Sequence, residues 1–566
     1  MTNVTLSLPT CNTAIAPISP TNEETITRKP GLINLLPTEI LEIVFIHCAS
    51  DHHRACGSSA PSPPSWVNVS YVSHRWRNVA LNCPTLWTYL FVTPPRWTDE
   101  LLARSKQASL KLHLIWKFPI PTHTELRFLE KIMNHVERIQ EFRLHLPVAC
   151  SDHGFFSKLS SPAPRLQTPH ISSADLAWRW QWPPVLFDGD TPALRMLELT
   201  SCPVRWYSLK LSGLTTLSLR CVPVSVQQNT AEFLATLGCM QDLTYLYLDD
   251  ALASAAGFIS SATFSTFQKI NLPHLSRLLI IAPLSTVIAL LSCVNIPLKT
   301  QVRLQCRSEP GFSIDGYTLL SSSLTQRFNM PDDWAPSNLT IRSLVIDLMQ
   351  GMVGLTCSTS DRDCRSYLDM SQTEWESHSN VPLQIIAYYG QSMTKSDKDY
   401  ITSDLCCSIP WTNVQTVHFL NPPFSSTFWN KTLGHFEELR YLRLSCGNMP
   451  DLASALSITR LTPRGHTENE GRYADRGPDR LFAPVLKELE LDRILLLSQM
   501  EDRTTLLPIA DAQSLYDALS TRKGSPGQLR MVRCRVAKYG PAAGLDMVGT
   551  WEGGHFRVVE ESNQRR

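Results

Sequence analysis

A short apolar pattern that recurs along the chain constrains its fold more than any other sequence feature. From about Ser109 onward, an apolar residue is followed by two variable residues, a second apolar residue, one variable residue and a third apolar residue. Four instances begin at residues 194, 214, 243 and 275, so they are 20, 29 and 32 residues apart. A period of about 20–29 residues is typical of arrays in which each repeat contributes one strand. Written as their three apolar positions, the instances are Ile139/Phe142/Leu144, Leu194/Leu197/Leu199, Leu214/Leu217/Leu219, Leu243/Leu246/Leu248, Leu275/Leu278/Ile280, Ile341/Leu344/Ile346, Val414/Val417/Phe419, Leu439/Leu442/Leu444, Leu486/Leu489/Leu491 and Leu529/Val532/Cys534.

The last two apolar positions of each instance predict a short strand, because residues two apart point to the same face of a strand. Helical stretches lie between several of these strands, at 225–237, 284–294 and 511–519. Strands that alternate with helices favour parallel stacking with the helices on one side. The sequence therefore predicts an irregular α/β repeat, a curved solenoid with one open face. An ordinary mixed α/β domain in a leucine-rich sequence is the alternative.

Residues 31–92 have a different character, with dense apolar helical segments around a Pro/Ser-rich stretch at 56–65. Pro37 suits the first position of a helix, and Glu39 in the first turn is favourable to the helix dipole. Apolar side chains fill roughly 200° of this helix, whereas a single neighbour covers only about 100°. A second helical segment is expected around 66–72, and Ser73 can cap a third. A unit on the order of 40 ordered residues rarely buries so much apolar surface alone, so we expect the solenoid or another protein to cover it.

The residues of this helical unit resemble the F-box. They read Leu36-Pro37-x-Glu39-Ile40-Leu41-x-Ile43-x-Phe45, then Val72-Ser73-x-Arg75-Trp76-Arg77-x-x-Ala80, then Pro84-x-Leu86-Trp87. In particular, the chain is similar to F-box proteins of mushroom-forming fungi, in which the box precedes an irregular leucine-rich-repeat-like region. Three features depart from the family pattern: Ser73 stands where a cysteine is usual, a Pro/Ser-rich insertion follows the first helix, and the coiled helix that often precedes the box in this group is not seen in the sequence.

The resemblance implies an adaptor of a cullin–RING (SCF-type) ubiquitin ligase, which is not itself an enzyme. The box would dock on the linker subunit that joins it to the cullin, and the solenoid would bind an unknown protein substrate. A ligase-independent scaffold or protein-interaction module is the alternative. The residues implied to contact the linker protein are Leu36, Pro37, Ile40, Leu41, Val44, Phe45, Val72 and Trp76. Each of them is equally compatible with packing in the core of the unit.

These features divide the chain into four parts. We expect a disordered lead at 1–30, the F-box-like unit at 31–92 with a loop insertion at 50–65, the solenoid at 93–540 and a tail at 541–566. Two polar stretches, 357–381 and 462–478, are expected to be surface loops. Polar residues at strand ends are candidate substrate contacts on the open face: Thr200, Arg220, Asp249, Asp250, Ser445 and Asp492.

Composition and motifs argue against other functions. The formal charge is +1, from 52 Lys and Arg against 51 Asp and Glu, so no overall field favours nucleic acid or an anionic membrane. The uncharged run 278–298 is long enough to span a bilayer, but Pro283 breaks it. The beginning of the sequence lacks the pattern of a secretory signal, and we expect a cytoplasmic or nuclear location. No phosphate-binding loop or nucleophile motif appears, and the His/Cys-rich segment 47–56 lacks the spacing of a metal site, so we expect no catalytic residues, cofactor or metal.

Overall fold

The computed structural model of the protein describes most of the chain between the first helix and the last strand. The described residues are 32–56, 65–91, 95–115, 122–146, 155–174, 182–255, 269–309, 314–328, 340–349, 351–361, 371–389, 393–409, 413–420, 428–429, 432, 436, 438–445, 486–492, 531–536, 547–552 and 555–560.

Eighteen strands form one continuous, mostly parallel sheet. Its strands in chain order are β1 (Tyr89–Leu90), β2 (Leu110–Ile115), β3 (Ile139–Leu146), β4 (Thr168–Ser173), β5 (Met196–Thr200), β6 (Thr216–Arg220), β7 (Tyr245–Asp249), β9 (Arg277–Pro283), β11 (Gln301–Arg307), β12 (Ser343–Met349), β13 (Met352–Ser358), β14 (Leu383–Tyr388), β15 (Thr416–Leu420), β16 (Tyr441–Ser445), β17 (Glu488–Asp492), β18 (Met531–Val536), β19 (Met547–Glu552) and β20 (His555–Glu560). A separate pair joins β8 (Ile270–Asn271) to β10 (Val294–Asn295). The mixed α/β class and the parallel sheet agree with the predicted α/β solenoid.

The apolar patterns of the sequence form the core of this sheet. The last two apolar positions of every instance lie within a strand, as predicted. Leu197, Leu217, Leu246 and Leu278 pair in register across β5, β6, β7 and β9, and all four are buried. Because the register is maintained from strand to strand, each leucine packs beside its equivalent in the next strand, and the core extends along the array.

Strand order departs from chain order at one place. Strand β11 pairs in parallel with β14, β14 pairs antiparallel with β13, β13 pairs antiparallel with β12, and β12 pairs in parallel with β15. The chain therefore passes over two strand positions after β11 and fills them afterwards. Gly351 enables the β12–β13 turn because its φ of 86° suits a residue without a side chain.

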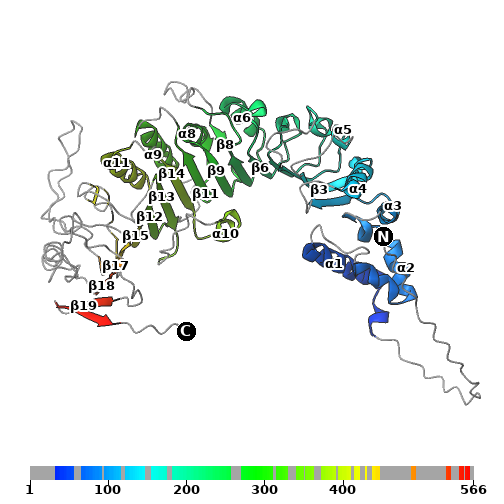
Figure 1. Ribbon diagram of the computed structural model, residues 1–566, viewed down its shortest axis with the longest axis horizontal. Coiled ribbons are helices and arrows are strands. Elements are labelled where there is room, and N and C mark those ends of the chain that lie inside the picture. Colours follow the sequence, from blue (N-terminus) through cyan, green and yellow to red (C-terminus); the bar gives the residue numbers. More distant parts are fainter. Residues whose placement is uncertain are drawn as a thin grey trace, which may run out of the picture.

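Helices cover one side of the sheet, and the whole array is bent into an arch with these helices on its convex side (Figure 1). They are α3 (Pro95–Ser105), α4 (His123–Met133), α5 (Phe155–Lys158), α6 (Thr230–Leu237), α8 (Leu284–Cys293), α9 (Ile314–Phe328) and α11 (Lys395–Cys407). Helices α6 and α8 confirm the predictions at 225–237 and 284–294, while the predicted helix at 511–519 lies outside the described residues. The uncharged run 278–298 divides between β9 and α8, both largely buried in the core. Among the described helices, none has the length and apolar character needed to cross a membrane.

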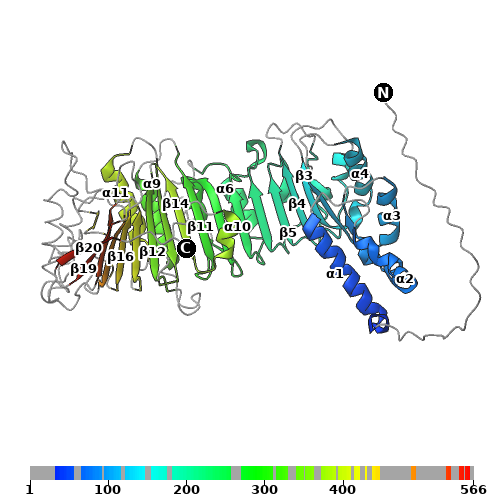
Figure 2. The same cartoon turned by 60° about the horizontal axis from the view of Figure 1, so that its bottom comes forward.

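The N-terminal helical unit precedes the sheet and lies at one end of the arch (Figure 2). It consists of the 3-10 helix η1 (Leu32–Leu35), helix α1 (Thr38–Cys56), the 3-10 helix η3 (Ser65–Tyr71), helix α2 (His74–Asn82) and the 3-10 helix η4 (Pro84–Trp87). Ser73 caps α2 as predicted, since its hydroxyl accepts a hydrogen bond from the Trp76 N–H. The expected second helix is the 3-10 segment η3. Strand β1 follows and pairs with β2, so the unit continues directly into the sheet.

Several predicted boundaries differ from the structure. Helix α1 continues to Cys56, so residues 50–56 of the expected loop insertion are helical; Gly57 is the first residue that disfavours a helix. The expected loop 357–381 begins with the end of β13 and contains α10 (Gln372–Ser377), which buries Trp375 completely. The expected tail 541–566 contains β19 and β20, which form an antiparallel hairpin at the end of the sheet. The predicted lead 1–30 and the predicted loop 462–478 lie outside the described residues.

Candidate functional site

The residues implied to contact a linker protein divide into exposed and buried groups. Exposed are Pro37, Ile40, Val44 and Val72; half-buried are Leu36 and Trp76; buried are Leu41 and Phe45. The exposed fractions are 42% for Ile40, 41% for Val44 and 61% for Val72.

Leu41 and Phe45 are internal packing residues of the helical unit. The Phe45 and Trp76 ring centroids are 5.1 Å apart. Trp66 and Trp87 complete this core with an edge-on contact at 5.1 Å. Their burial corrects the expectation that Leu41 and Phe45 contact the partner. The i, i+4 spacing of these two residues places them on one helix face, and that face lies against the unit's own η3, α2 and η4.

An adjoining face of α1 is apolar but uncovered. Ile40, Ile43 and Val44 lie at i, i+3 and i+4 and are each about half exposed. Neighbouring segments add further exposed apolar side chains. We call the following set the apolar docking surface: Ile33, Leu35, Ile40, Ile43, Val44, Tyr71 and Val72.

The segments that carry the apolar docking surface are held together by polar contacts. The Arg75 guanidinium of α2 donates a hydrogen bond to the Leu36 carbonyl, which joins the start of α2 to the start of α1. The Arg77 guanidinium lies over the Tyr71 ring, 5.5 Å from its centroid.

Fully burying one aliphatic side chain contributes about 1.5–3 kcal/mol. Covering these half-exposed residues would therefore contribute several kcal/mol to association with a partner.

The concave face of the sheet is the second candidate surface. Along each strand, leucines and other apolar residues point toward the convex-side helices, and the alternate residues point into the arch. On β2 to β6 most of these alternate residues are partly or fully accessible, although Ser172 and Ser218 are buried. We call this region the open half of the concave face; it comprises Lys111, His113, Ile115, Glu141, Arg143, His145, His170, Glu198 and Arg220.

Beyond β7 the same face is partly covered. Helix α10 lies on the concave side (Figure 1), and its Glu376 accepts a 2.7 Å hydrogen bond from the Tyr245 hydroxyl. The Gln301 amide donates 2.9 Å to the carbonyl of His378, the residue after α10. Seven concave-facing residues on later strands are less than a tenth exposed: Arg303, Asp347, Thr356, Gln384, His418, Ser445 and Glu490. A partner can therefore reach the described concave face mainly over β2 to β6.

Charged side chains meet where β6, β7 and β11 end. The Arg307 guanidinium pairs with Asp250 and lies 3.4 Å from Asp249, whose other carboxylate oxygen is 3.9 Å from Arg220 Nε. Burial raises the pKa of Asp249, although Arg307 opposes this shift. The sequence predicted Arg220, Asp249 and Asp250 as contacts, and the structure brings them together. Arg307 was missed because β11 carries no three-position apolar pattern.

The other predicted contacts have different positions. Ser445 is buried and lies 2.9 Å from the His418 ring, so it does not face solvent. Thr200 is half-buried at the end of β5, and the side chain of Asp492 lies outside the described residues.

Carboxylates of the open half are already engaged. Glu141 pairs with Lys111 and lies 3.8 Å from His113 Nε2; the interactions with His113 and Lys111 lower the pKa of Glu141 to about 2. Hydrogen bonding from His170 likewise lowers the pKa of Glu198. These histidine–glutamate pairs were not predicted, because they join strands β2 to β5 that are 25 or more residues apart in the chain.

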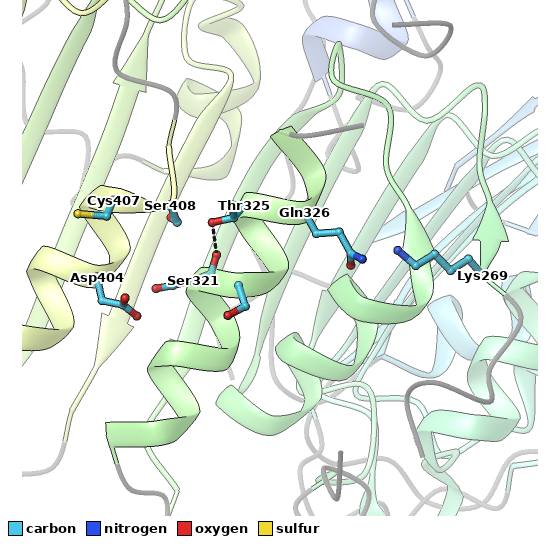
Figure 3. A pocket seen from close by; sticks show the side chains of 8 residues that line it. Lys269, Ser321, Thr325, Gln326, Asp404, Cys407 and Ser408 are labelled. Carbon is cyan, nitrogen blue, oxygen red and sulfur yellow. Dashed lines mark hydrogen bonds between the residues drawn. The ribbon is translucent and has the colours of Figure 1, made fainter. Parts of the chain in front are cut away.

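A polar pocket of about 600 Å³ lies on the helix-covered side, between α9 and α11 (Figure 3). Its lining is Lys269, Ser321, Ser322, Thr325, Gln326, Asp404, Cys407 and Ser408. Figure 3 shows Asp404 and Ser321 pointing into the space between the two helices. The Thr325 hydroxyl donates 2.9 Å to the Ser321 carbonyl, so it is engaged within its own helix. None of these eight residues is a histidine that could activate a hydroxyl or thiol.

Metal binding receives no support from the described part of the chain, where no three His, Cys, Asp or Glu residues group as ligands. The side chains of His52, His53 and Cys56, which belong to the His/Cys-rich segment of the sequence, lie outside the described residues. Comparison with known proteins adds no family, since neither a protein-family model nor a curated protein matches the sequence.

Proposed function

We propose that the protein is a non-catalytic adaptor of a cullin–RING ubiquitin ligase. In this proposal the N-terminal helical unit acts as an F-box and docks on the linker protein, while the concave face of a leucine-rich-repeat-like solenoid holds a protein substrate. Holding both partners on one chain raises the local concentration of substrate at the ligase. The proposal rests on sequence resemblance and on two accessible surfaces that lie on different parts of the chain.

The observation that carries the proposal is the apolar docking surface. A helical unit that buries Leu41 and Phe45 in its own core still exposes Ile40, Ile43 and Val44 on an adjoining face of α1. Isolated exposed apolar residues are ordinary, but a group on adjacent segments is typical of a protein interface. Its position at one end of the sheet leaves the concave face free for a second partner.

A ligase-independent scaffold is the second candidate function. It is favoured by the burial of Leu41 and Phe45, because a helical unit that satisfies its own core needs no partner to fold. The two functions differ in their prediction for the exposed residues alone. In the scaffold, changing them alters no association.

The test is capture of a cullin and its linker protein by the tagged full-length chain from a eukaryotic cell extract. We expect the unmodified chain to capture both proteins and the double variant Ile40→Asp/Val44→Asp to capture neither. Both positions are about half exposed, so the double variant should fold. Val224→Asp is the matched control, since Val224 is 81% exposed and lies outside the helical unit. Absence of the cullin at high recovery of the unmodified chain would favour the scaffold. Capture by the double variant would show that the apolar docking surface does not bind the linker protein and would overturn the observation on which the proposal depends.

A further inference from the structure

We propose that the open half of the concave face binds an acidic segment of a partner protein that carries an apolar side chain among its carboxylates. This names the substrate class of the adaptor, and in that respect it rests on the proposed function. The binding chemistry itself follows from the side chains of β2 to β6.

Accessibility selects this region. Ile115 is 51% exposed and Arg143 and His145 are exposed, whereas the concave-facing Val345 and Asp347 of β12, His418 of β15 and Ser445 of β16 are buried. Helix α10 contacts Tyr245 of β7 and Gln301 of β11, which ends the accessible region on that side. The site is therefore the accessible part of the concave face between the helical unit and α10.

Six side chains of this site carry nitrogen atoms that can donate hydrogen bonds, and two carry carboxylates. Both carboxylates are engaged by neighbours on the same face, Glu141 by Lys111 and Glu198 by His170. An incoming carboxylate therefore meets negative charges that are already compensated. The remaining hydrogen-bond donors are therefore the groups that can bind an acidic ligand.

Three of these side chains can still donate a hydrogen bond to an incoming carboxylate. Arg143 makes no side-chain hydrogen bond or ion pair with any described residue, although its charge helps to lower the pKa of Glu198. His145 uses its Nδ1 toward the Ser172 hydroxyl at 2.5 Å, which leaves its Nε2. Arg220 lies 3.9 Å from Asp249, whose carboxylate also interacts with Arg307. A guanidinium forms its strongest contacts with carboxylates, often through two parallel hydrogen bonds.

An apolar contact lies beside these donors. Ile115 of β2 pairs in register with His145 of β3, so the two side chains are neighbours on the concave face. Next to them, the Tyr89 and His113 rings meet edge to face with centroids 6.3 Å apart. A ligand that combines carboxylates with one aliphatic side chain would use both parts of the surface.

Nucleic acid fits this surface less well than an acidic peptide. A phosphate backbone needs a continuous basic track, and sequence-independent affinity increases with the number of Lys and Arg contacts. Glu141 and Glu198 interrupt the row that runs from Lys111 to Arg220. The separated donors suit carboxylates spaced along an extended peptide.

The test is fluorescence anisotropy of the full-length protein with a fluorescein-labelled peptide in which a central Leu is flanked by Glu residues. Arg143→Glu should weaken binding by about tenfold or more, because it replaces a charge-assisted contact by repulsion. Arg127→Glu is the matched control, since Arg127 is exposed on α4 on the convex side of the sheet. A peptide with Lys in place of Glu, a peptide with Ser in place of Leu and a single-stranded oligonucleotide of equal charge complete the set.

The inference is supported if the acidic peptide binds, Arg143→Glu weakens it and Arg127→Glu does not. It is overturned if the acidic peptide does not bind, if the two variants behave alike, or if the oligonucleotide binds as well as the peptide. Replacing Leu by Ser without loss of affinity overturns the apolar part. Capture of the cullin is measured in parallel: if capture succeeds while the peptide fails, the adaptor proposal stands and only this inference is lost.

Discussion

Arg327 provides the sharpest prediction of stability, because it is a buried cation with few partners. The side chain is 6% exposed at the end of α9, and its Nη2 donates 2.8 Å to the Thr300 carbonyl and 3.5 Å to the Leu298 carbonyl. Its Nε and Nη1 are buried without a hydrogen-bond partner among the described residues. Burial lowers the pKa of Arg327 from 12.5 to about 10.

The magnitude follows from this shift. At about 1.4 kcal/mol per pKa unit, keeping the guanidinium charged in this environment costs about 3 kcal/mol. Because the folded state binds the proton more weakly than the unfolded state, the cost is complete below pH 10 and disappears as the pH rises toward 12.5. Arg327→Met removes the charge and keeps most of the volume, but leaves the Thr300 carbonyl unpaired at a cost of about 1–2 kcal/mol. We expect a net gain of about 1–2 kcal/mol at neutral pH.

The assay is urea unfolding followed by circular dichroism, combined with hydrogen exchange at β11, the strand that follows Thr300. A long array can unfold in parts, so the exchange measurement assigns the effect to this region. Arg327→Lys is the control: it retains a cation and should show no comparable gain. Loss of stability in Arg327→Met by more than about 1 kcal/mol would refute the reasoning.

Three further variants test other parts of the structure. Trp375→Ala should release α10 from the concave face, because a fully buried Trp contributes about 3–5 kcal/mol; hydrogen exchange in 371–381 should rise, while exposed Thr373→Ala should leave it nearly unchanged. Glu141→Gln should cost about 1–2 kcal/mol at neutral pH and flatten the acid-unfolding curve. The pKa of Glu141 falls from 4.5 to about 2, so its stabilisation is present above pH 4.5 and lost as the pH falls through 2; an unchanged acid limb would contradict the Lys111 and His113 contacts. Cys221, exposed with φ of 49°, should tolerate Gly but lose about 1 kcal/mol as Val in thermal unfolding, and equal stability of both variants would argue against backbone strain.

The strands that carry the three-position apolar pattern could be predicted from the sequence, because period-two leucines at a near-regular spacing are typical of short strands buried on one face. Strands β13 and β14 could not. Their partners are set by the passage over two strand positions after β11, which no local pattern encodes. The burial of Trp375 could not be predicted either, since one aromatic residue among Ser, Thr and Glu gives little sign of a core position.

The candidate surfaces show the same limit. The spacing of Ile40, Leu41, Val44 and Phe45 predicted a helix with an apolar arc too wide for one neighbour, and in the structure Ile40 and Val44 remain exposed while Leu41 and Phe45 are buried. Which residues faced inward depended on where η3, α2 and η4 pack, and the sequence left that open. Arg143 and His145 were not predicted as binding residues, because the concave face on which they lie is formed only when β2 to β5 pair.

The reordered strands also bear on how the chain matures during synthesis. From β1 to β9, each strand of the main sheet pairs with the strand that was synthesised before it. This part of the sheet can therefore form during translation. After β11 this stops, because the next position in the sheet belongs to β14 at Leu383–Tyr388, more than 70 residues later. The edge of β11 therefore stays unpaired until β14 has been synthesised. An unpaired strand edge can associate with other nascent chains. We expect translation pauses or chaperone contacts to fall in that interval.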